Sequence, residues 1–349
     1  MKAAGSKRAA GAWFRSFPWF LSDAMRSSAA DYHHMGPGIL IIVFKGIGDV
    51  LLTTPLIRAL KKGLPESRLY FLTRRPSLGI LENNPNLSGV FCREDRPLPA
   101  IRAAGIDISL DFMRSASSGF YALFSGAGKR LAFSYPAGRI FHNILPVKKE
   151  NPGYTVFDRL QLLEPLGIPD DGPEPELYFK PENSARAEAF LSGEGIAPGT
   201  FTVTLDITSP REHRRWAPEN FSRLADSLVT AFGAKVIFLW GPGELDYVKA
   251  AMSSAREKHL LCPDFNLLDM AALLKRTALH AGTSSAPMHI AVSQGTPTFT
   301  IYAPQNSPAS WSPPGPLHSW AQGELASLPF ETVWARLSAH AGAIKGHSA

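Results

Sequence analysis

A short loop with two glycines, residues 45–49, follows the longest unbroken aliphatic run of the chain, residues 39–43. The loop reads Lys-Gly-Ile-Gly-Asp, and its last residue, Asp49, stands where a helix is expected to begin. A carboxylate at that position can cap the helix by accepting from its first amides. It can equally remove a proton from a hydroxyl nucleophile as a general base. Both roles stay open at this point, and the neighbouring Gly48 allows a ligand or another backbone to approach closely.

Hydroxyl and guanidinium groups gather in a second segment, after another expected strand. Thr208 and Ser209 offer hydroxyls, and Arg214 offers a guanidinium that can hold two phosphate oxygens at once. This combination suits a diphosphate, although a basic surface turn would have the same composition. In the turn at residues 240–244, Glu244 could bond a ribose hydroxyl, but capping of the following helix is the favoured interpretation.

The segment with the strongest signal for a binding site is residues 282–291, which read G-T-S-S-A-P-M-H-I-A. It combines a strand end, small hydroxylated residues and a helix that we expect to start at Pro287 and to end at Gly295. The exposed amides at such a helix start bind phosphate groups. His289, in the first turn, could donate to the same phosphate or could be an ordinary buried helical histidine.

The elements that would position these residues alternate between strands and helices, so the sequence predicts an α/β fold. Strands are expected at residues 39–44, 69–72, 89–92, 106–112, 201–205, 235–240, 259–261, 278–281 and 298–302. Helices are expected at residues 50–62, 154–166, 218–232, 245–254, 267–275, 287–294 and 330–337. Pro55 predicts either a kink in the first helix or a new helix start capped by Thr54. Two successive halves of this kind suggest two Rossmann-like domains, with the last helix packing back on the first.

Composition sets the expected domain boundaries. Residues 1–38 form a basic and aromatic leader, residues 39–175 a first domain, residues 176–325 a second domain and residues 326–349 a C-terminal helix and tail. The stretch at 170–176, rich in Asp, Pro and Glu, is the expected linker. The leader could lie on an anionic membrane surface. It could also be a flexible extension or a consequence of start-site choice, because Met35 stands just before the first strand.

Overall composition excludes several classes of protein. Hydrophobic residues make up 45% and charged residues 19% of the 349 residues, which is typical of a globular protein. We expect no membrane-spanning helix, because no apolar run approaches about 20 residues. Cys92 and Cys262 are far apart, so a cysteine zinc site or a disulfide framework is not expected. Half of the formal net charge of +6 lies in residues 1–38, so the rest of the chain is only mildly basic, which argues against a nucleic-acid binder. Neither a dinucleotide fingerprint nor a P-loop occurs.

Taken in order, four motifs resemble glycosyltransferase family 9, the ADP-heptose:lipopolysaccharide heptosyltransferase family. Residues 46–55, G-I-G-D-V-L-L-T-T-P, match the family's opening motif, and R-R-W at 214–216 with Pro218 matches its K-R-W-P-like segment. Gly241 through Glu244 match its G-x-x-E segment. Residues 283–291 match its N-D-S/T-G-P-M-H-L/I-A motif, and residues 295–297 match the G-T-P that follows. The similarity runs from about residue 39 to residue 337.

The resemblance implies a GT-B fold, in which two facing Rossmann-like domains enclose an interdomain cleft. It implies inverting sugar transfer with no metal and no cofactor, Asp49 as the general base and Arg214 as a stabiliser of the leaving diphosphate. On the donor side it implies diphosphate contacts from Thr208, Ser209 and Arg214, a ribose contact from Glu244 and a nucleobase contact from Phe265. Around the phosphates and the departing sugar it places Ser284, Ser285, Ala286 and His289. For the acceptor it implies Gly48, Asp49, Asp111 and Arg114.

The implied function is transfer of a heptose or related sugar from a nucleotide sugar, with ADP-heptose as the expected donor. The implied acceptor is a lipopolysaccharide core or another lipid-linked glycan. Such an enzyme would be cytoplasmic and could contact the inner face of the membrane peripherally, with no nucleic-acid partner.

Two departures from the family pattern matter, one in the K-R-W segment and one in the late motif. Arg214 replaces a lysine, and Ser284 and Ala286 replace the aspartate and glycine of the late motif. Because Asp49 is present, we favour a changed donor sugar over a loss of activity. A non-catalytic GT-B protein that binds nucleotide or glycan remains the alternative, and a nucleotide-sugar epimerase is a weaker one.

Overall fold

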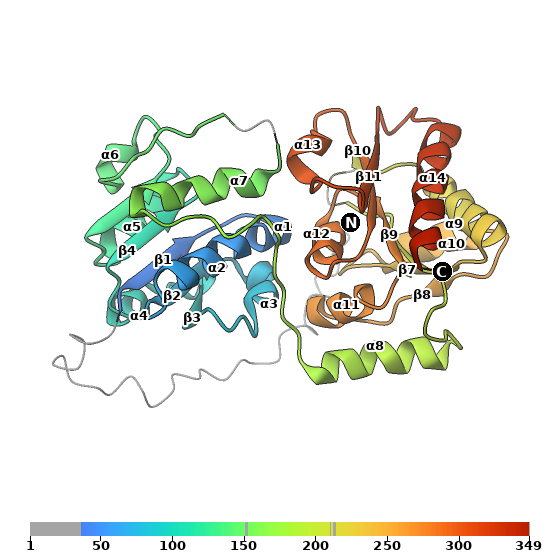
Figure 1. Cartoon of the computed structure of the whole chain (residues 1–349), viewed down its shortest axis with the longest axis horizontal. Coiled ribbons are helices and arrows are strands. Elements are labelled where there is room, and N and C mark those ends of the chain that lie inside the picture. The colour runs from blue at the N-terminus through green and yellow to red at the C-terminus, as the bar shows by residue number, and fades with distance from the viewer. Residues whose placement is uncertain (1–35, 151–152, 210, 212–213, 349) are drawn as a thin grey trace, which may run out of the picture. The chain divides into compact units, whose positions relative to one another are not determined.

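The computed structural model describes residues 36–150, 153–209, 211 and 214–348, with side chains up to residue 346. The predicted leader lies almost wholly outside these residues. Within the described part, the chain forms two parallel sheets flanked by helices (Figure 1). The strands of the first sheet are β1 (Gly38–Ile42), β2 (Arg68–Thr73), β3 (Gly89–Cys92), β4 (Ile108–Asp111) and β5 (Lys129–Ala132). Those of the second are β6 (Thr202–Asp206), β7 (Lys235–Leu239), β8 (Leu260–Leu261), β9 (Leu279–Thr283), β10 (Thr298–Tyr302) and β11 (His318–Gln322).

Both sheets are wound outward from a central strand. The spatial order is β3-β2-β1-β4-β5 in the first sheet and β11-β10-β9-β6-β7-β8 in the second. The winding direction therefore reverses between β1 and β4, where Ile42 pairs with Asp111, and between β6 and β9, where Asp206 pairs with Gly282. Ligands of open α/β sheets bind outside the carboxyl ends of the strands at such reversal points. The loops after these four strands are consequently the places to look for a site.

Most expected helices are present, with instructive differences. The helices of the first half are α1 (Ile47–Leu51), α2 (Thr54–Gly63), α3 (Leu78–Leu81), α4 (Leu98–Ala103), α5 (Ala116–Phe124), α6 (Gly138–Phe141) and α7 (Thr155–Leu160). Those that follow are α8 (Pro181–Gly193), α9 (Pro218–Phe232), α10 (Leu245–Ser253), α11 (Leu267–Leu274), α12 (Ala286–Ser293), α13 (Pro308–Trp311) and α14 (Phe330–Ser348). Short 3₁₀ helices are η3 (Arg75–Ser77), η4 (Arg93–Asp95) and η5 (Gln161–Leu166).

Two proline positions explain where the expected helices divide. The helix expected at residues 50–62 is two helices, and Pro55 lies in the first turn of α2, with Thr53 rather than Thr54 at the N-cap position. The helix expected at 154–166 is α-helical only as far as Leu160, and Pro165 lies inside the 3₁₀ turn that follows. Proline lacks the amide hydrogen that an α-helix interior needs, so it favours helix starts and breaks regular turns.

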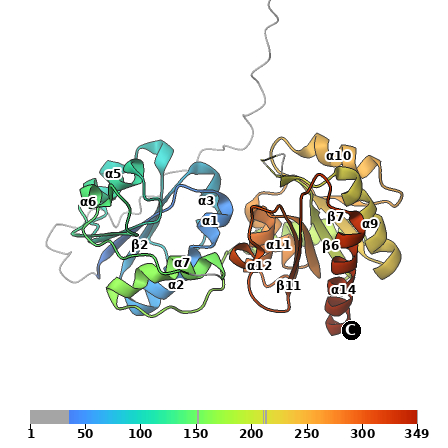
Figure 2. The ribbon, with the colours of Figure 1, turned by 90° about the horizontal axis from the view of Figure 1, so that it is seen from above.

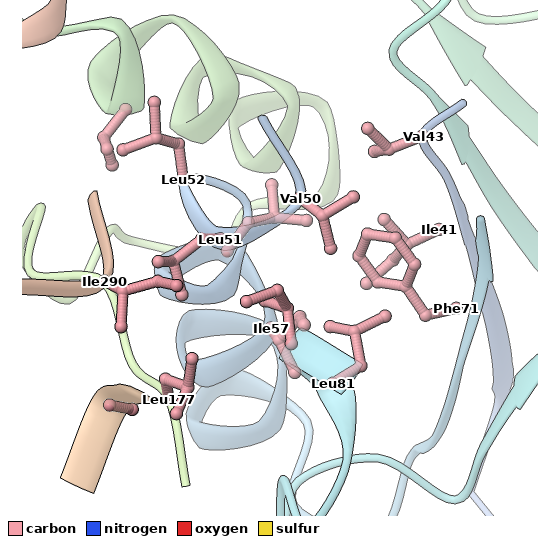
Figure 3. Close-up of a cluster of buried hydrophobic side chains, with 14 of the residues drawn as sticks. Ile41, Val43, Val50, Leu51, Leu52, Ile57, Phe71, Leu81, Leu177 and Ile290 are labelled. Carbon is pink, nitrogen blue, oxygen red and sulfur yellow. The ribbon is translucent and has the colours of Figure 1, made fainter. Parts of the chain in front are cut away.

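The central strand β1 is buried on both faces, as its continuous apolar sequence predicts. Ile39 and Ile41 face one core cluster and Leu40 and Ile42 face another, because successive side chains of a strand point to opposite sides. The first cluster continues from the sheet through α1 and includes Ile290 of α12 (Figure 3). One continuous apolar core therefore joins α1, which follows β1, to α12, which follows β9.

The last helix packs on the second sheet, so our prediction that residues 330–337 return to the first domain is wrong. The buried residues Val333 and Leu337 of α14 belong to the same core cluster as Val203 of β6. The helix α14 lies beside α9 (Figure 2). Phe330 stacks on Trp216 with ring centroids 6.3 Å apart. The apolar stripe of α14 also continues past residue 337, through Ala341 and Ile344, and gives the helix a longer buried face.

Candidate active site

Asp49 lies in the first turn of α1, but it does not cap that helix. Gly46 occupies the N-cap position, and no side chain bonds the first amides. Instead the Asp49 Oδ1 accepts a hydrogen bond from the Nη2 of Arg159 at 2.7 Å, and the Lys45 Nζ lies 3.8 Å away. The Asp49 side chain is 21% exposed. The carboxylate is thus held in place on one side and open to a ligand on the other.

Arg159 is a site residue that sequence reasoning missed. It comes from α7, 110 residues after Asp49, and only 6% of its side chain is exposed. Burial lowers the pKa of its guanidinium, whereas the neighbouring Asp49 carboxylate acts in the opposite direction. No motif marks this arginine in the sequence. Its contact with Asp49 fixes the orientation of the carboxylate that we expect to do the chemistry.

His289 meets the Asp49 loop directly. A Cβ atom at Gly48 would lie only 2.5 Å from the Cδ2 of His289, so glycine is needed for this approach. The imidazole is buried, and burial lowers its pKa to about 4. Its Nδ1 has no hydrogen-bond partner among the described residues. A neutral imidazole with an unused nitrogen therefore stands beside the Asp49 loop.

A buried carboxylate, Asp206, organises the hydroxyl groups at the end of β6. Its Oδ1 accepts from the amide and the hydroxyl of Thr208 at 3.2 and 3.0 Å, and its Oδ2 accepts from the Ser285 hydroxyl. The Thr283 hydroxyl in turn donates to the Thr208 carbonyl at 2.6 Å. Burial raises the pKa of Asp206 to about 6. We did not single out Asp206 from the sequence, although it opens the segment in which we recognised Thr208 and Ser209.

Glu244 joins the same network, and its side chain does not cap α10. The residue occupies the N-cap position of that helix, but no side-chain cap bond is present. Its Oε2 accepts from the Thr208 hydroxyl at 2.7 Å and from the Gly241 amide at 2.9 Å. The single hydroxyl proton of Thr208 is therefore shared between two carboxyl groups, those of Asp206 and Glu244.

Arg214 is a partly buried cation that forms no ion pair within the described part of the chain. Its Nε is buried and has no hydrogen-bond partner there, and residues 210, 212 and 213 lie outside that part. Burial and the nearby Arg211 lower the pKa of its guanidinium. The next residue, Arg215, donates from Nε to the Ser209 carbonyl at 2.7 Å. Arg214 is thus available to an incoming anion.

Around the start of α12, the remaining predicted donor residues are partly exposed. Ser284 and Ala286 flank the N-cap residue Ser285, and no side chain caps the helix, so its first amides are open to an anion. The helix begins at Ala286, one residue before Pro287, and Gly295 follows it with a φ of 73°. Phe265 is partly buried and packs edge-to-face on Phe190 of α8, with ring centroids 6.0 Å apart.

On the acceptor side, Asp111 is wholly buried. It accepts from the Met113 amide at 2.8 Å and lies 3.1 Å from the Nε2 of His142. These contacts favour a positioning role over the direct acceptor contact that we predicted. Arg114, three residues on, is exposed and has a φ of 51°. Asp111 thus fixes the turn that presents the Arg114 side chain.

Comparison with known proteins decides the family. A family model described as glycosyltransferase family 9 (heptosyltransferase) matches residues 98–323, which is more than half of the chain. The chain belongs to glycosyltransferase family 9. It is therefore a glycosyltransferase, as the four motifs suggested. The matched region contains Asp206, Arg214, Glu244 and His289 and begins after the loop that carries Asp49.

Individual relatives agree with this assignment. Lipopolysaccharide heptosyltransferase 3 of Escherichia coli is 23% identical over 278 residues, which cover 73% of this chain and 80% of that protein. A family 9 glycosyltransferase from Veillonella parvula superposes with a TM-score of 0.75 at 24% identity, covering 82% of this chain and 86% of the other. The E. coli ADP-heptose lipopolysaccharide heptosyltransferase II superposes with a TM-score of 0.71 at 15% identity, covering 88% and 99%. These structures confirm the expected GT-B fold.

Among the described residues, no group of three or more His, Cys, Asp and Glu side chains could hold a metal ion. In the same part of the chain, no helix is long and apolar enough to cross a membrane.

Proposed function

We propose that this family 9 glycosyltransferase moves a heptose or a related sugar from a nucleotide sugar, with ADP-heptose as the first candidate donor, to a lipopolysaccharide core or another lipid-linked glycan. The transfer is one displacement that inverts the anomeric centre and uses no metal ion. The names of the relatives support the sugar, the donor and the acceptor. The proposed place of action is the cytoplasm, at the inner face of the membrane in which the acceptor is anchored. We further propose that residues 39–175 bind the acceptor and residues 176–325 the nucleotide sugar.

The reaction begins at Asp49. Its carboxylate removes the proton from an acceptor hydroxyl, and the hydroxyl oxygen attacks the anomeric carbon of the heptose. The bond from that carbon to the diphosphate breaks as the new bond forms. The released negative charge meets the Arg214 guanidinium and the uncapped amides at the start of α12. Arg159 keeps Asp49 oriented throughout.

One contact carries this proposal: the loop of Asp49, from the first sheet, touches His289 of α12, from the second. A base from one half therefore lies beside a helix start from the other that can bind a diphosphate. On the donor side we propose that Thr208, Ser209, Ser284, Ser285, Ala286 and His289 surround the diphosphate and sugar, that Glu244 bonds the ribose and that Phe265 stacks on the base. On the acceptor side we propose contacts from Gly48 and Arg114.

Replacing Asp49 by Asn tests the base. With ADP-heptose and a core acceptor, we expect the transfer rate of the variant to fall by about 10²- to 10⁴-fold, because the amide cannot accept the proton. Calorimetric affinity for ADP should stay close to that of the unmodified chain. Thermal unfolding of both proteins shows whether Arg159, deprived of its counter-charge, has destabilised the fold.

The outcomes separate the competing functions. Unchanged transfer by the Asp49→Asn variant would remove Asp49 from the mechanism. Tight binding of UDP or GDP in preference to ADP would move the donor assignment. Binding of ADP with no transfer by the unmodified chain would favour the non-catalytic alternative.

A further inference from the structure

The segment from residue 112 to residue 149 has an unusual charge distribution. It contains six basic residues and no acidic one, so its formal charge of +6 equals the formal net charge of the whole chain. The six are Arg114, Lys129, Arg130, Arg139, Lys148 and Lys149. Lys148 and Lys149 pair with Asp158 and Glu164. Among the described residues, Lys129 and Arg139 are exposed and form no ion pair.

The same segment leaves large apolar side chains in solvent. Phe120 and Phe124 of α5 are 45% and 44% exposed, and their rings contact each other at 4.7 Å between centroids. Ile140 of α6 is 67% exposed. The inner face of α5, at Ser118 and Ala122, is buried against the sheet. The outer face of this helix therefore carries two phenylalanines, and no charged residue occurs in α5 at all.

Helices α5 and α6 form one surface. A Cβ atom at Gly119 would lie 2.4 Å from the Phe141 ring, so the two helices meet at that glycine. Phe120 follows Gly119 in the chain, and Ile140 precedes Phe141. Both exposed side chains therefore lie next to the contact between the two helices. We define the α5–α6 surface as Phe120, Phe124 and Ile140 together with the cations Lys129 and Arg139.

We propose that the α5–α6 surface docks on an anionic phospholipid bilayer. Aromatic and aliphatic side chains that enter the interface, next to cations that attract anionic headgroups, are the features that such a contact needs. A second copy of this chain is a poor occupant of the same surface, because it would bring two sets of unpaired cations together. The inference rests on the proposed function, since α5 begins two residues after Arg114, the proposed acceptor contact.

Vesicle sedimentation with the full chain tests the proposal. The probes are vesicles of phosphatidylcholine alone and vesicles containing about one third phosphatidylglycerol. We expect binding to the anionic vesicles, weakened by salt. The variant Lys129→Glu with Arg139→Glu should bind at least about 25-fold more weakly, because each of the two basic residues near such a surface contributes about a factor of five. The variant Phe120→Ser with Phe124→Ser should lose affinity as well. The matched control, Lys249→Glu with Leu317→Ala, changes one exposed cation and one exposed apolar residue of the second half and should bind as the unmodified chain does.

Transfer to a soluble core oligosaccharide, measured in parallel, separates this inference from the proposed function. Both α5–α6 variants should keep that activity. The docking proposal would be overturned if these variants bound vesicles as well as the control does. It would also be overturned if the unmodified chain did not bind anionic vesicles. Either result would leave the enzyme assignment intact. Concentration-dependent dimerisation that the Phe120→Ser with Phe124→Ser variant abolishes would overturn it in favour of a second copy.

Discussion

Two carboxylates of the site differ in what stabilises them. Asp49 is held by the guanidinium of Arg159, whereas Asp206 is held by the hydroxyls of Ser285 and Thr208 and by one amide. Hydroxyls provide hydrogen bonds without a full positive charge, so burial dominates for Asp206 and raises its pKa to about 6. Asp206 is therefore suited to positioning hydroxyls around a phosphate.

The raised pKa predicts how Asp206→Asn changes stability with pH. In the folded chain Asp206 binds its proton more tightly than in the unfolded chain, where the pKa of an aspartate is near 3.8. Its contribution to stability is thus present below about pH 4 and is lost as the pH rises through 6. Asparagine does not titrate, so the free energy of unfolding of the variant relative to the unmodified chain should rise between pH 4 and 7, by up to about 3 kcal/mol.

Urea unfolding at several pH values between 4.5 and 7.5 measures this difference. The variant Asp246→Asn, at an exposed position on α10, is the control and should show no such trend. A constant difference between Asp206→Asn and the unmodified chain over that range would contradict the prediction.

At the scale of elements, the approach of α1 to α12 depends on a missing side chain. A methyl group at position 48 would collide with the His289 ring. We expect Gly48→Ala to separate the Asp49 loop from α12 and to lower the transfer rate by about tenfold or more, because small displacements of reacting groups are costly. Steady-state kinetics with ADP-heptose measure the effect.

Gly46→Ala is the matched control, since a methyl group there has no neighbour within 4 Å and the φ of Gly46 is −70°. If the collision is the cause, removing the His289 ring should relieve it. The double variant Gly48→Ala with His289→Ala should then lose less activity, expressed as activation free energy, than the sum of the losses of the two single variants. Strictly additive losses would show that the two residues do not act through their contact.

At the scale of the whole molecule, the core cluster that runs from the first sheet through α1 to α12 predicts coupled unfolding. Leu51 is completely buried in that cluster, next to Ile290 (Figure 3). Leu51→Ala should lower the free energy of unfolding by about 2–5 kcal/mol. Five of the seven tryptophans lie between residues 216 and 334, so most of the tryptophan fluorescence reports on the second half of the chain.

If the halves unfold together, Leu51→Ala should lower the fluorescence midpoint as much as the midpoint seen by circular dichroism. Leu317→Ala, at a residue that is 46% exposed, should leave both midpoints in place. An early transition in circular dichroism with an unchanged fluorescence midpoint would show that the halves unfold separately.

The sequence alone predicted the α/β alternation, most strands and helices, and the loops that follow β1, β4, β6 and β9. These features follow from local patterns: apolar runs for strands buried on both faces, and glycine, proline and hydroxyl residues where strands turn into helices. The strands β5 and β11 escaped prediction because they are edge strands with polar residues, such as Lys129 and His318, in place of an apolar run. The helices α3, α4, α5, α6, α8 and α13 escaped it too.

Only the tertiary structure decided which side chains meet. Arg159 is 110 residues from Asp49, and Ser285 is 79 residues from Asp206, so no local pattern could pair them. Folding also brings Thr208 close to Glu244, whose carboxylate accepts a hydrogen bond from the Thr208 hydroxyl. In the same way it brings the second sheet to the apolar face of α14. Residue types and spacing determine which chemistry is available and where strands end. Partner choice depends on which strands become neighbours in the sheet and on burial, and both arise only when the whole chain packs.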